Sequence, residues 1–233
     1  MTREAYVKDL LKTYQLIHVL ADKNDCRVMH LRHRQLGRDL VLRSFPAPVT
    51  AYEVLCRYRC ENLPEVYDVI TLEDGQVALE EFIDGITLAE MLETKRYRYG
   101  DAKKVMVAVC NGLSLLHRRQ LVHRDVKPEN IMITAHGRVV LIDLNASRQL
   151  SENNRDTVIM GTVGYASPEQ LGVLQSDART DVYAAGVLLN VMLTGKHPSE
   201  RIPRGRIGKV IRRCTNINPA DRFSSVDKLR EAL

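Results

Sequence analysis

The stretch VHRDVKPEN, residues 122–130, decides the fold of this chain. It contains four charged side chains, a histidine and an asparagine, and it lies between the apolar runs LSLLH (113–117) and IMI (131–133). Charged groups beside buried segments lose hydration, so they need hydrogen-bond partners or a chemical role. The residues that follow this stretch indicate which role applies.

A β-hairpin pattern follows the stretch. It consists of the strand NIMIT (130–134), the turn AHG (135–137) and the strand RVVLID (138–143). Because an antiparallel hairpin places the first residue of one strand beside the last residue of the other, the pattern predicts that Asn130 and Asp143 lie about 5 Å apart at Cα. An amide oxygen and a carboxylate suit Mg²⁺, which takes its remaining ligands from water and substrate phosphates. The hairpin is therefore a candidate magnesium site.

Two more residues of the opening stretch suit phosphoryl transfer. Asp125 lies five residues before Asn130 and can approach the same point as a proton acceptor. Lys127 provides a cation for the phosphoryl group in transfer. A capped turn or a polar surface cluster is the simpler interpretation, but the joint spacing of Asp125, Asn130 and Asp143 disfavours it.

The composition is that of an ordinary globular protein. The 233 residues suit one large domain or two small lobes, with 45% hydrophobic and 27% charged residues. The five cysteines form no CxxC pair, which indicates reduced thiols and a cytoplasmic location. The longest uncharged apolar stretches, such as AAGVLLNVML (184–193), are too short to span a bilayer, so we expect no membrane segment in this chain.

The basic charge raises the question of nucleic-acid binding. The formal net charge is +5, and basic residues cluster in RHR (32–34), KRYRY (95–99) and RIPRGRIGKVIRR (201–213). These clusters lack a nucleic-acid motif and regular aromatic interleaving. A solvated face or a docking site for acidic partners is the better interpretation, and nucleic acid is the least favoured partner.

The hydrophobic period changes near residue 83, which predicts an α+β fold with two lobes joined as one domain. We expect a β-rich N-lobe with one helix over about residues 1–82, a hinge at about 81–85, and a helical C-lobe over about 86–233. The expected N-lobe strands are 14–20, 27–34, 39–45, 65–72 and 76–83, with a helix at 50–60. The expected C-lobe helices are 87–95, 102–119, 180–195, 207–214 and 225–233.

The motif HRDVKPEN resembles the catalytic loop of eukaryotic-type (Hanks-type) serine/threonine protein kinases, and other motifs of that family follow in the same order. LIDLN (141–145) occupies the place of the metal-binding Asp-Phe-Gly motif. GTVGYASPEQ (161–170) resembles the substrate-binding loop that ends in Ala-Pro-Glu. The resemblance implies a bilobal kinase-like fold from about residue 14 onward, in which Asp181 braces the catalytic loop and Arg222 pairs with Glu169.

The resemblance also implies an activity, namely transfer of the ATP γ-phosphoryl group to a protein hydroxyl with ATP and Mg²⁺ as cofactors. In this interpretation Asp125 accepts the hydroxyl proton, Lys127 steadies the phosphoryl group and Thr162 orients both. Asn130 and Asp143 hold Mg²⁺. His123 is then a packing and hydrogen-bonding residue, and Ser151 and Thr157 are candidate phosphosites for Arg124.

The N-lobe departs from the family pattern where ATP should bind. Non-glycine residues stand at the positions of the glycine-rich loop (Ala21, Lys23 and Cys26), and Arg43 stands in place of the phosphate-pairing lysine. The nucleotide-site positions that the resemblance implies are Ala21, Lys23, Val28, Val41, Arg43, Glu81, Ile83 and Met132.

The usual glutamate partner of the lysine is also missing, since Ala51 stands at its position. Glu80 lies just before the hinge, so we expect Arg43 to pair with Glu80 instead. An alternative is that Lys23 reaches the phosphates from the loop. Two functions follow: an active serine/threonine kinase of low activity, or a pseudokinase that acts as a nucleotide-binding or scaffold module.

Overall fold

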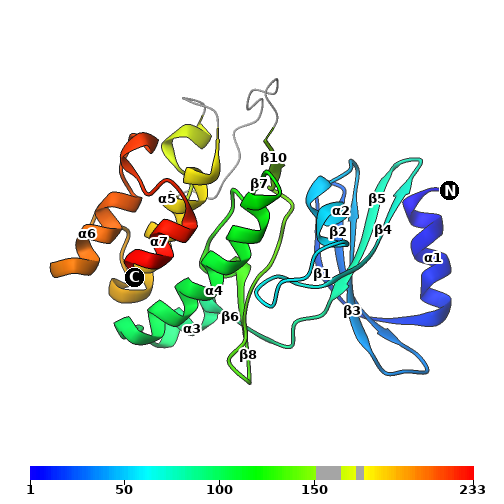
Figure 1. Cartoon of the computed structure of the whole chain (residues 1–233). Coiled ribbons are helices and arrows are strands. Elements are labelled where there is room, and N and C mark those ends of the chain that lie inside the picture. Colours follow the sequence, from blue (N-terminus) through cyan, green and yellow to red (C-terminus); the bar gives the residue numbers. More distant parts are fainter. Residues whose placement is uncertain (151–163, 172–175) are drawn as a thin grey trace. The chain divides into compact units, whose positions relative to one another are not determined.

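The chain divides into two compact units, one rich in β-strands and one mainly helical (Figure 1). The structure is a computed structural model that describes residues 1–150, 164–171 and 176–233. The first unit comprises Met1–Arg59 and Pro64–Ile83, and the second comprises Cys60–Leu63 and Asp84–Leu233. The secondary structure confirms the α+β class expected from the hydrophobic period.

The first unit is built on a five-stranded antiparallel sheet with the strand order β1-β2-β3-β5-β4. All five strands were expected from the alternation of apolar and polar residues. A two-residue turn, Asn24 and Asp25, joins β1 to β2, and both residues have positive φ (52° and 60°), as the tightest hairpin turns require. The strands are β1 (Tyr14–Lys23), β2 (Cys26–His33), β3 (Asp39–Phe45), β4 (Val66–Leu72) and β5 (Gly75–Glu81).

The helix α1 (Arg3–Thr13) covers one face of this sheet and was not expected (Figure 1). Thr2 caps it, since its Oγ1 accepts a hydrogen bond from the N–H of Ala5 at 3.3 Å. The signal in the sequence is that cap followed by apolar residues at helical spacing. Four of them, Tyr6, Val7, Leu10 and Leu11, pack against a buried cluster of Met29, Leu31, Leu40, Leu42 and Val77.

The helix α2 (Thr50–Leu55) is shorter than the helix expected over 50–60. Its first half buries Ala51, Tyr52 and Leu55, whereas residues 56–59 are exposed. Most helix stability in proteins comes from packing of an apolar face, and the second half has no such face. The helix therefore ends where its buried face ends.

The second unit is organised around α5 (Ala178–Thr194), which is buried on nearly all sides. It ends at Gly195, whose φ of 69° is the left-handed conformation common after helices. Gly186 allows a close helix contact, because a Cβ there would lie 2.3 Å from the Cβ of Cys214 on α6. The remaining helices and strands of the unit are β6 (Gly85–Thr87), α3 (Leu88–Thr94), α4 (Tyr99–Arg118), β7 (Leu121–Val122), η1 (Pro128–Asn130), β8 (Ile131–Thr134), β9 (Val139–Leu141), β10 (Arg148–Gln149), η2 (Pro168–Leu171), α6 (Gly205–Cys214), η3 (Pro219–Asp221) and α7 (Val226–Ala232).

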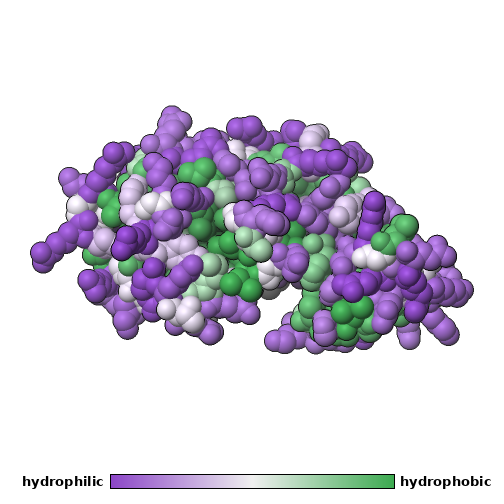
Figure 2. All heavy atoms as spheres, turned by 90° about the horizontal axis from the view of Figure 1, so that it is seen from below, coloured by the Kyte–Doolittle hydropathy of each residue, from purple (hydrophilic) through white to green (hydrophobic). Residues whose placement is uncertain are grey.

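Most of the surface visible in Figure 2 is hydrophilic, and hydrophobic residues appear there in separate patches. The larger apolar side chains are mostly buried in the two units. Among the described residues, no helix combines the length and the apolar character that crossing a bilayer requires.

Candidate functional site

Three of the residues singled out in the sequence meet in the loop between β7 and β8. The Oδ2 of Asp125 lies 2.7 Å from Lys127 Nζ and accepts a hydrogen bond from Asn130 Nδ2 at 2.8 Å. Asn130 Nδ2 also donates to the Asp125 carbonyl oxygen at 2.9 Å. The Lys127 and Asp125 side chains are 18% and 14% exposed, so the pair is shielded but still open to solvent. The carboxylate of Asp125, the ammonium group of Lys127 and the amide of Asn130 thus lie in direct contact.

Local geometry explains why Asn130 returns to Asp125. Pro128 opens the short 3₁₀ helix η1, where its fixed φ suits a first helical position and its missing N–H is not needed. The N–H of Asn130 donates to the carbonyl oxygen of Lys127 at 3.1 Å. The turn brings the amide back within reach of the carboxylate five residues earlier.

Asp181 on α5 braces the same loop through hydrogen bonds, as predicted. Its carboxylate accepts hydrogen bonds from the backbone N–H groups of His123 (2.9 Å) and Arg124 (2.8 Å), and from His117 Nε2 (2.7 Å). Burial opposes ionisation, but the hydrogen bonds and the charge of His117 hold the pKa of Asp181 below its usual value. The brace also holds Arg124 at a φ of 69°, a strained value for a residue other than glycine.

His123 behaves as a structural residue, in agreement with the sequence interpretation. It is fully buried, and burial lowers its pKa even though the charges of Asp181, Asp143 and Asp125 act in the other direction. Its Nδ1 accepts a hydrogen bond from the Asp125 N–H at 3.3 Å. A neutral buried imidazole positions the Asp125 backbone and is not placed to take a proton from a substrate.

The hairpin forms as expected, but its register differs by one residue from the prediction. The N–H of Thr134 donates to the carbonyl oxygen of Arg138 across the turn, and the N–H of Ile142 donates to the carbonyl oxygen of Asn130 at 2.8 Å. Ile142, not Asp143, is therefore opposite Asn130, and the prediction of a directly opposed pair was wrong. The two expected strands have unequal lengths, so the last residue of the second extends past the first.

Asp143 leaves the strand in the left-handed conformation, with a φ of 65°. Its Oδ1 accepts a hydrogen bond from the Asn145 N–H at 3.4 Å, and its charge acts on His123 together with that of Asp125. Among the described residues, no three His, Cys, Asp or Glu side chains gather as a metal site. A magnesium site here would use two protein ligands, Asn130 and Asp143.

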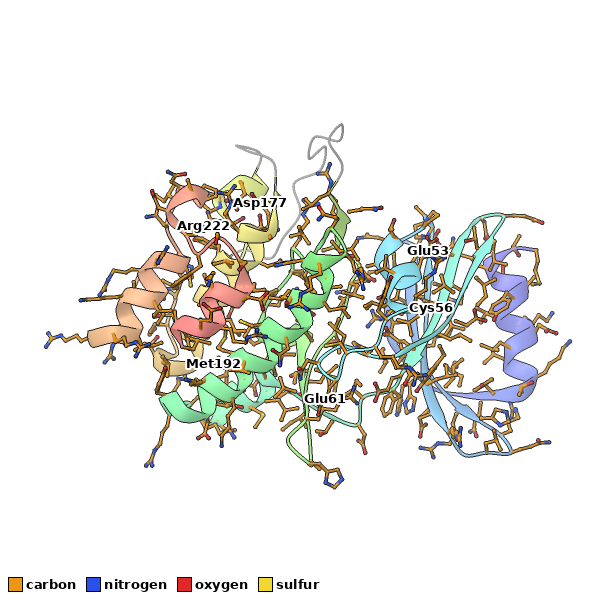
Figure 3. All side chains as sticks on the ribbon, viewed as in Figure 1. Glu53, Cys56, Glu61, Asp177, Met192 and Arg222 are labelled. Atoms are coloured by element: carbon orange, nitrogen blue, oxygen red, sulfur yellow. The ribbon has the colours of Figure 1, made fainter. Side chains whose placement is uncertain are left out.

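In the first unit, the expected replacement of the lysine–glutamate pair is confirmed. Arg43 Nε lies 2.5 Å from Glu80 Oε1, and the two side chains are 8% and 4% exposed. Arg43 is opposite Ala78 and Glu80 is opposite Val41, so the pair is diagonal on one face of the sheet. Glu53 on α2 (Figure 3) does not compensate for Ala51, since its Oε1 accepts a hydrogen bond from Gln76 Nε2 at 3.0 Å.

The register of the sheet aligns several of the implied nucleotide positions. Ala21, Val28 and Arg43 are direct neighbours across β1, β2 and β3, and Val41 lies on the same face as Arg43, two residues earlier. Glu81 is opposite Leu40, so its side chain belongs to the other face. Lys23 pairs with Cys26 at the end of the hairpin, Ile83 is buried at the end of the unit, and Met132 lies on β8 in the second unit.

Sequence reasoning missed His30, which lies on the same face as Val28. Its ring stacks on Phe82 with centroids 3.8 Å apart, and its Nε2 is 2.7 Å from Asp39 Oδ1. A histidine between Met29 and Leu31 in MHLRHR (29–34) gives no signal of such stacking. Thr162, Ser151 and Thr157 lie outside the described residues.

The expected pair of Glu169 and Arg222 is confirmed in the second unit. Arg222 donates from Nη1 and Nη2 to the two carboxylate oxygens at 2.7 and 2.8 Å, and both side chains are almost fully buried. Arg222 Nη1 also donates to the Arg179 carbonyl oxygen at 3.0 Å, near the N-terminus of α5, which begins after Asp177 (Figure 3). Burial opposes ionisation of Glu169, but Arg222 holds the pKa of that carboxyl below its usual value.

Comparison with known proteins relates this chain to protein kinases. A family model described as "Protein kinase domain" matches residues 49–231. The probable serine/threonine-protein kinase PknB of Bifidobacterium longum is 30% identical over 210 residues, covering 79% of this chain and 30% of that protein. The serine/threonine-protein kinase PknB of Mycobacterium tuberculosis is 30% identical over 218 residues, covering 85% of this chain and 34% of that protein. The chain thus spans about a third of the length of these relatives.

A solved structure has the same fold. The crystal structure of the Mycobacterium tuberculosis PknI kinase domain superposes with a TM-score of 0.71 at 23% identity and covers 94% of each chain. The likeness supports the bilobal, kinase-like α+β fold that the motifs imply.

Proposed function

Because a family model covers residues 49–231, the chain belongs to the protein kinase domain family, and on this premise we propose that it is a serine/threonine protein kinase. It transfers the γ-phosphoryl group of ATP to a serine or threonine hydroxyl of a protein. The observation that carries the proposal is the shared contact of Lys127 and Asn130 with Asp125 Oδ2. Relatives named as serine/threonine kinases support it.

Asp125 accepts the proton of the substrate hydroxyl in this proposal, and Lys127 stabilises the charge on the phosphoryl group. Phosphoryl transfer depends mainly on positioning and electrostatic stabilisation, and the loop braced by Asp181 provides a fixed position for both groups. Thr162, which would orient Asp125 and Lys127, is part of the proposal only through the family resemblance.

The donor set fits a magnesium ion. Asn130 directs its Nδ2 to Asp125, which leaves the amide oxygen for a metal, and Asp143 adds a carboxylate. Hard oxygen ligands with room for phosphates and water suit Mg²⁺. When bound, Mg²⁺ neutralises charge on the ATP phosphates.

Arg43 takes the place of the phosphate-pairing lysine in this proposal, and Glu80 orients it. The remaining nucleotide contacts are those implied by the resemblance, including Lys23 as an alternative phosphate ligand. We also propose that the two units form one kinase domain with a hinge near residues 81–85, and that the protein acts in the cytoplasm.

A pseudokinase is the second candidate, and the buried pair of Arg43 and Glu80 favours it. A guanidinium held by a buried carboxylate is less available to phosphates than an ammonium, and its planar shape suits a different geometry. Such a module binds nucleotide or a protein partner and acts through its conformation.

Nucleotide binding and phosphoryl transfer distinguish the two candidates. Thermal unfolding is measured with ATP in the presence and absence of Mg²⁺, and transfer of labelled phosphate is measured for the wild type, Asp125→Asn and the exposed control Asp101→Asn. We expect a Mg²⁺-dependent rise in Tm with ATP. Asp125→Asn should lower transfer by about 10²- to 10⁴-fold, and Asp101→Asn should leave it unchanged. ATP binding without Asp125-dependent transfer would exclude the kinase and favour the pseudokinase.

A further inference from the structure

Arg3, in the first turn of α1, connects three segments of the first unit that are distant in the sequence. Its Nη2 donates to Asp25 Oδ2 at 2.6 Å, and its Nη1 donates to the Asp25 carbonyl oxygen at 3.0 Å. Its backbone N–H donates to Asp74 Oδ1 at 2.7 Å, and its Nε lies 3.6 Å from Asp74 Oδ2. Nη1 also donates to Ser44 Oγ at 3.4 Å. One side chain thus joins the β1–β2 turn, the end of β3 and the β4–β5 turn.

Arg3 is largely shielded from solvent. Its side chain is only 12% exposed, although the side chain of Asp25 is 69% exposed. Gly75, the first residue of β5 after the β4–β5 turn, has a φ of 143°, and a Cβ there would lie 2.0 Å from the Phe45 carbonyl oxygen and 3.0 Å from Arg3 Cδ. The planar guanidinium, with several donors in fixed directions, suits this arrangement better than an ammonium would.

The segment that Arg3 holds is the one that the family resemblance aligns with the phosphate-facing loop. In this chain the loop has no glycine at the aligned positions, and its tip is the two-residue turn of Asn24 and Asp25. Arg27 adds a contact across the same hairpin, since its Nε donates to Asp22 Oδ2 at 2.9 Å. A turn without glycines and tied to α1 has less freedom than a glycine-rich loop.

We propose that Arg3 is a positioning residue that holds the β1–β2 turn in place and thereby prepares it to bind the phosphates of a nucleotide. The part that concerns nucleotide rests on the proposed function, whereas the restraint on the turn does not. A segment ordered before binding loses less conformational entropy when the ligand arrives. Loss of Arg3 therefore weakens ATP binding and affects the chemical step less.

Hydrogen exchange in the nucleotide-free protein tests the restraint. The variants are Arg3→Ala, Arg3→Lys and Asp25→Asn, which removes the charge of Asp25 from the contact, leaves the bond to its backbone carbonyl and keeps a residue that tolerates positive φ. Lys12→Ala is the control, because Lys12 lies on the same helix, is 76% exposed and pairs with Asp9. Since Asp25 is mostly exposed, we expect exchange over residues 21–27 to rise about two- to fivefold in Arg3→Ala and Asp25→Asn. Arg3→Lys should give a smaller rise and Lys12→Ala none.

ATP kinetics test the consequence. In Arg3→Ala and Asp25→Asn the KM for ATP should rise about two- to fivefold, with kcat within about twofold of the wild type. Unchanged exchange over residues 21–27, or a rise spread equally over α1 and the sheet, would overturn the restraint. A local rise in exchange with unchanged ATP KM would overturn the positioning role. If the wild type binds no ATP, the proposed function fails, and the exchange result still decides whether Arg3 restrains the turn.

Discussion

Two buried charged groups, Asp181 in the second unit and Arg43 in the first, are held in different ways. In the second unit, the carboxylate of Asp181 accepts two backbone N–H groups and one imidazole N–H, so its partners are mostly main chain. In the first unit, the guanidinium of Arg43 is held by another side chain, Glu80. If a charged side chain held by main-chain N–H groups is replaced, those groups lose their acceptor unless the loop changes its fold. A charged side chain held by another side chain can be replaced together with its partner.

This difference accounts for where the sequence keeps the family pattern and where it departs from it. The loop around Asp125 matches the kinase motif, and its geometry depends on backbone N–H groups that every residue type except proline supplies. In the first unit, Arg43 stands in place of the family's lysine and Ala51 in place of its glutamate. Arg43 and Glu80 nevertheless form an ion pair within the same sheet. The predictions below test this contrast, beginning with the largest expected effect.

Replacing Asp181 by alanine should cause the largest loss of stability. Three hydrogen-bond donors would remain buried without their acceptor, and the loop would lose its brace, so we expect the free energy of unfolding to fall by about 4 kcal/mol or more. Urea unfolding measures the change, with Asp101→Ala on the exposed face of α4 as control. An effect of Asp181→Ala no larger than that of the control would show that the backbone contacts do not hold the loop.

Breaking the Arg43–Glu80 pair should lower the free energy of unfolding by less than Asp181→Ala does. A second substitution should restore most of this loss. Glu80→Gln leaves Arg43 buried beside a neutral amide, and we expect a loss of about 3 kcal/mol. Replacing both residues, with Arg43→Met and Glu80→Leu, should recover most of that loss, because buried ion pairs are often replaceable by apolar side chains of similar size.

A double-mutant cycle over Arg43 and Glu80 measures the coupling. We expect a coupling energy of about 2 kcal/mol, which lies in the range for contacting residues. A cycle in which the two single changes simply add would contradict the paired arrangement. The variant with both Arg43→Met and Glu80→Leu should also have a lower ATP affinity if Arg43 contacts phosphate. Measuring ATP affinity beside stability therefore separates the stabilising role of Arg43 from its proposed binding role.

Much of the fold was predictable because the hydrophobic period and the sequence motifs indicate the same architecture. The strands of the sheet and the long helices of the second unit have clear apolar repeats, so tertiary packing reinforces the local pattern. The helix α1 was missed since its apolar residues are surrounded by charge, and its packing partner, the cluster around Leu31 and Leu42, is distant in the sequence. Residues 56–59 were assigned to a helix because periodicity does not reveal which face is buried.

The proximity of three candidate site residues was predictable, whereas the geometry around Asp143 was less so. Asp125, Lys127 and Asn130 lie close in sequence, and a short turn brings them together. The position of Asp143 depends on the register of the hairpin and on a left-handed φ of 65°, neither of which follows from residue types. The pairing of Arg43 with Glu80 was predictable, because two departures from the pattern compensate each other on neighbouring strands.

The stability that Asp181 provides should depend on pH in a defined direction. Its pKa is lower in the folded protein than in the unfolded chain, where an aspartate has a pKa of about 3.9. A carboxyl with a lowered folded pKa contributes stability that is complete above the unfolded value and is lost as the pH falls through the folded value. The stability difference between wild type and Asp181→Asn should therefore shrink as the pH falls below about 4. A difference that grows on acidification would contradict the lowered pKa.

The smallest effect should come from the cap of α1. Thr2→Ala removes the hydrogen bond from the Ala5 N–H to Oγ1 and should lower the free energy of unfolding by about 1 kcal/mol, while Thr2→Ser keeps the hydroxyl and should cost little. α1 packs on the sheet through Met29, Leu31 and Leu42, whereas Arg43 belongs to the opposite face of β3. If loss of the cap also changed the coupling between Arg43 and Glu80, the pair would depend on the whole sheet and not on its two side chains, and the contrast between Asp181 and Arg43 would weaken.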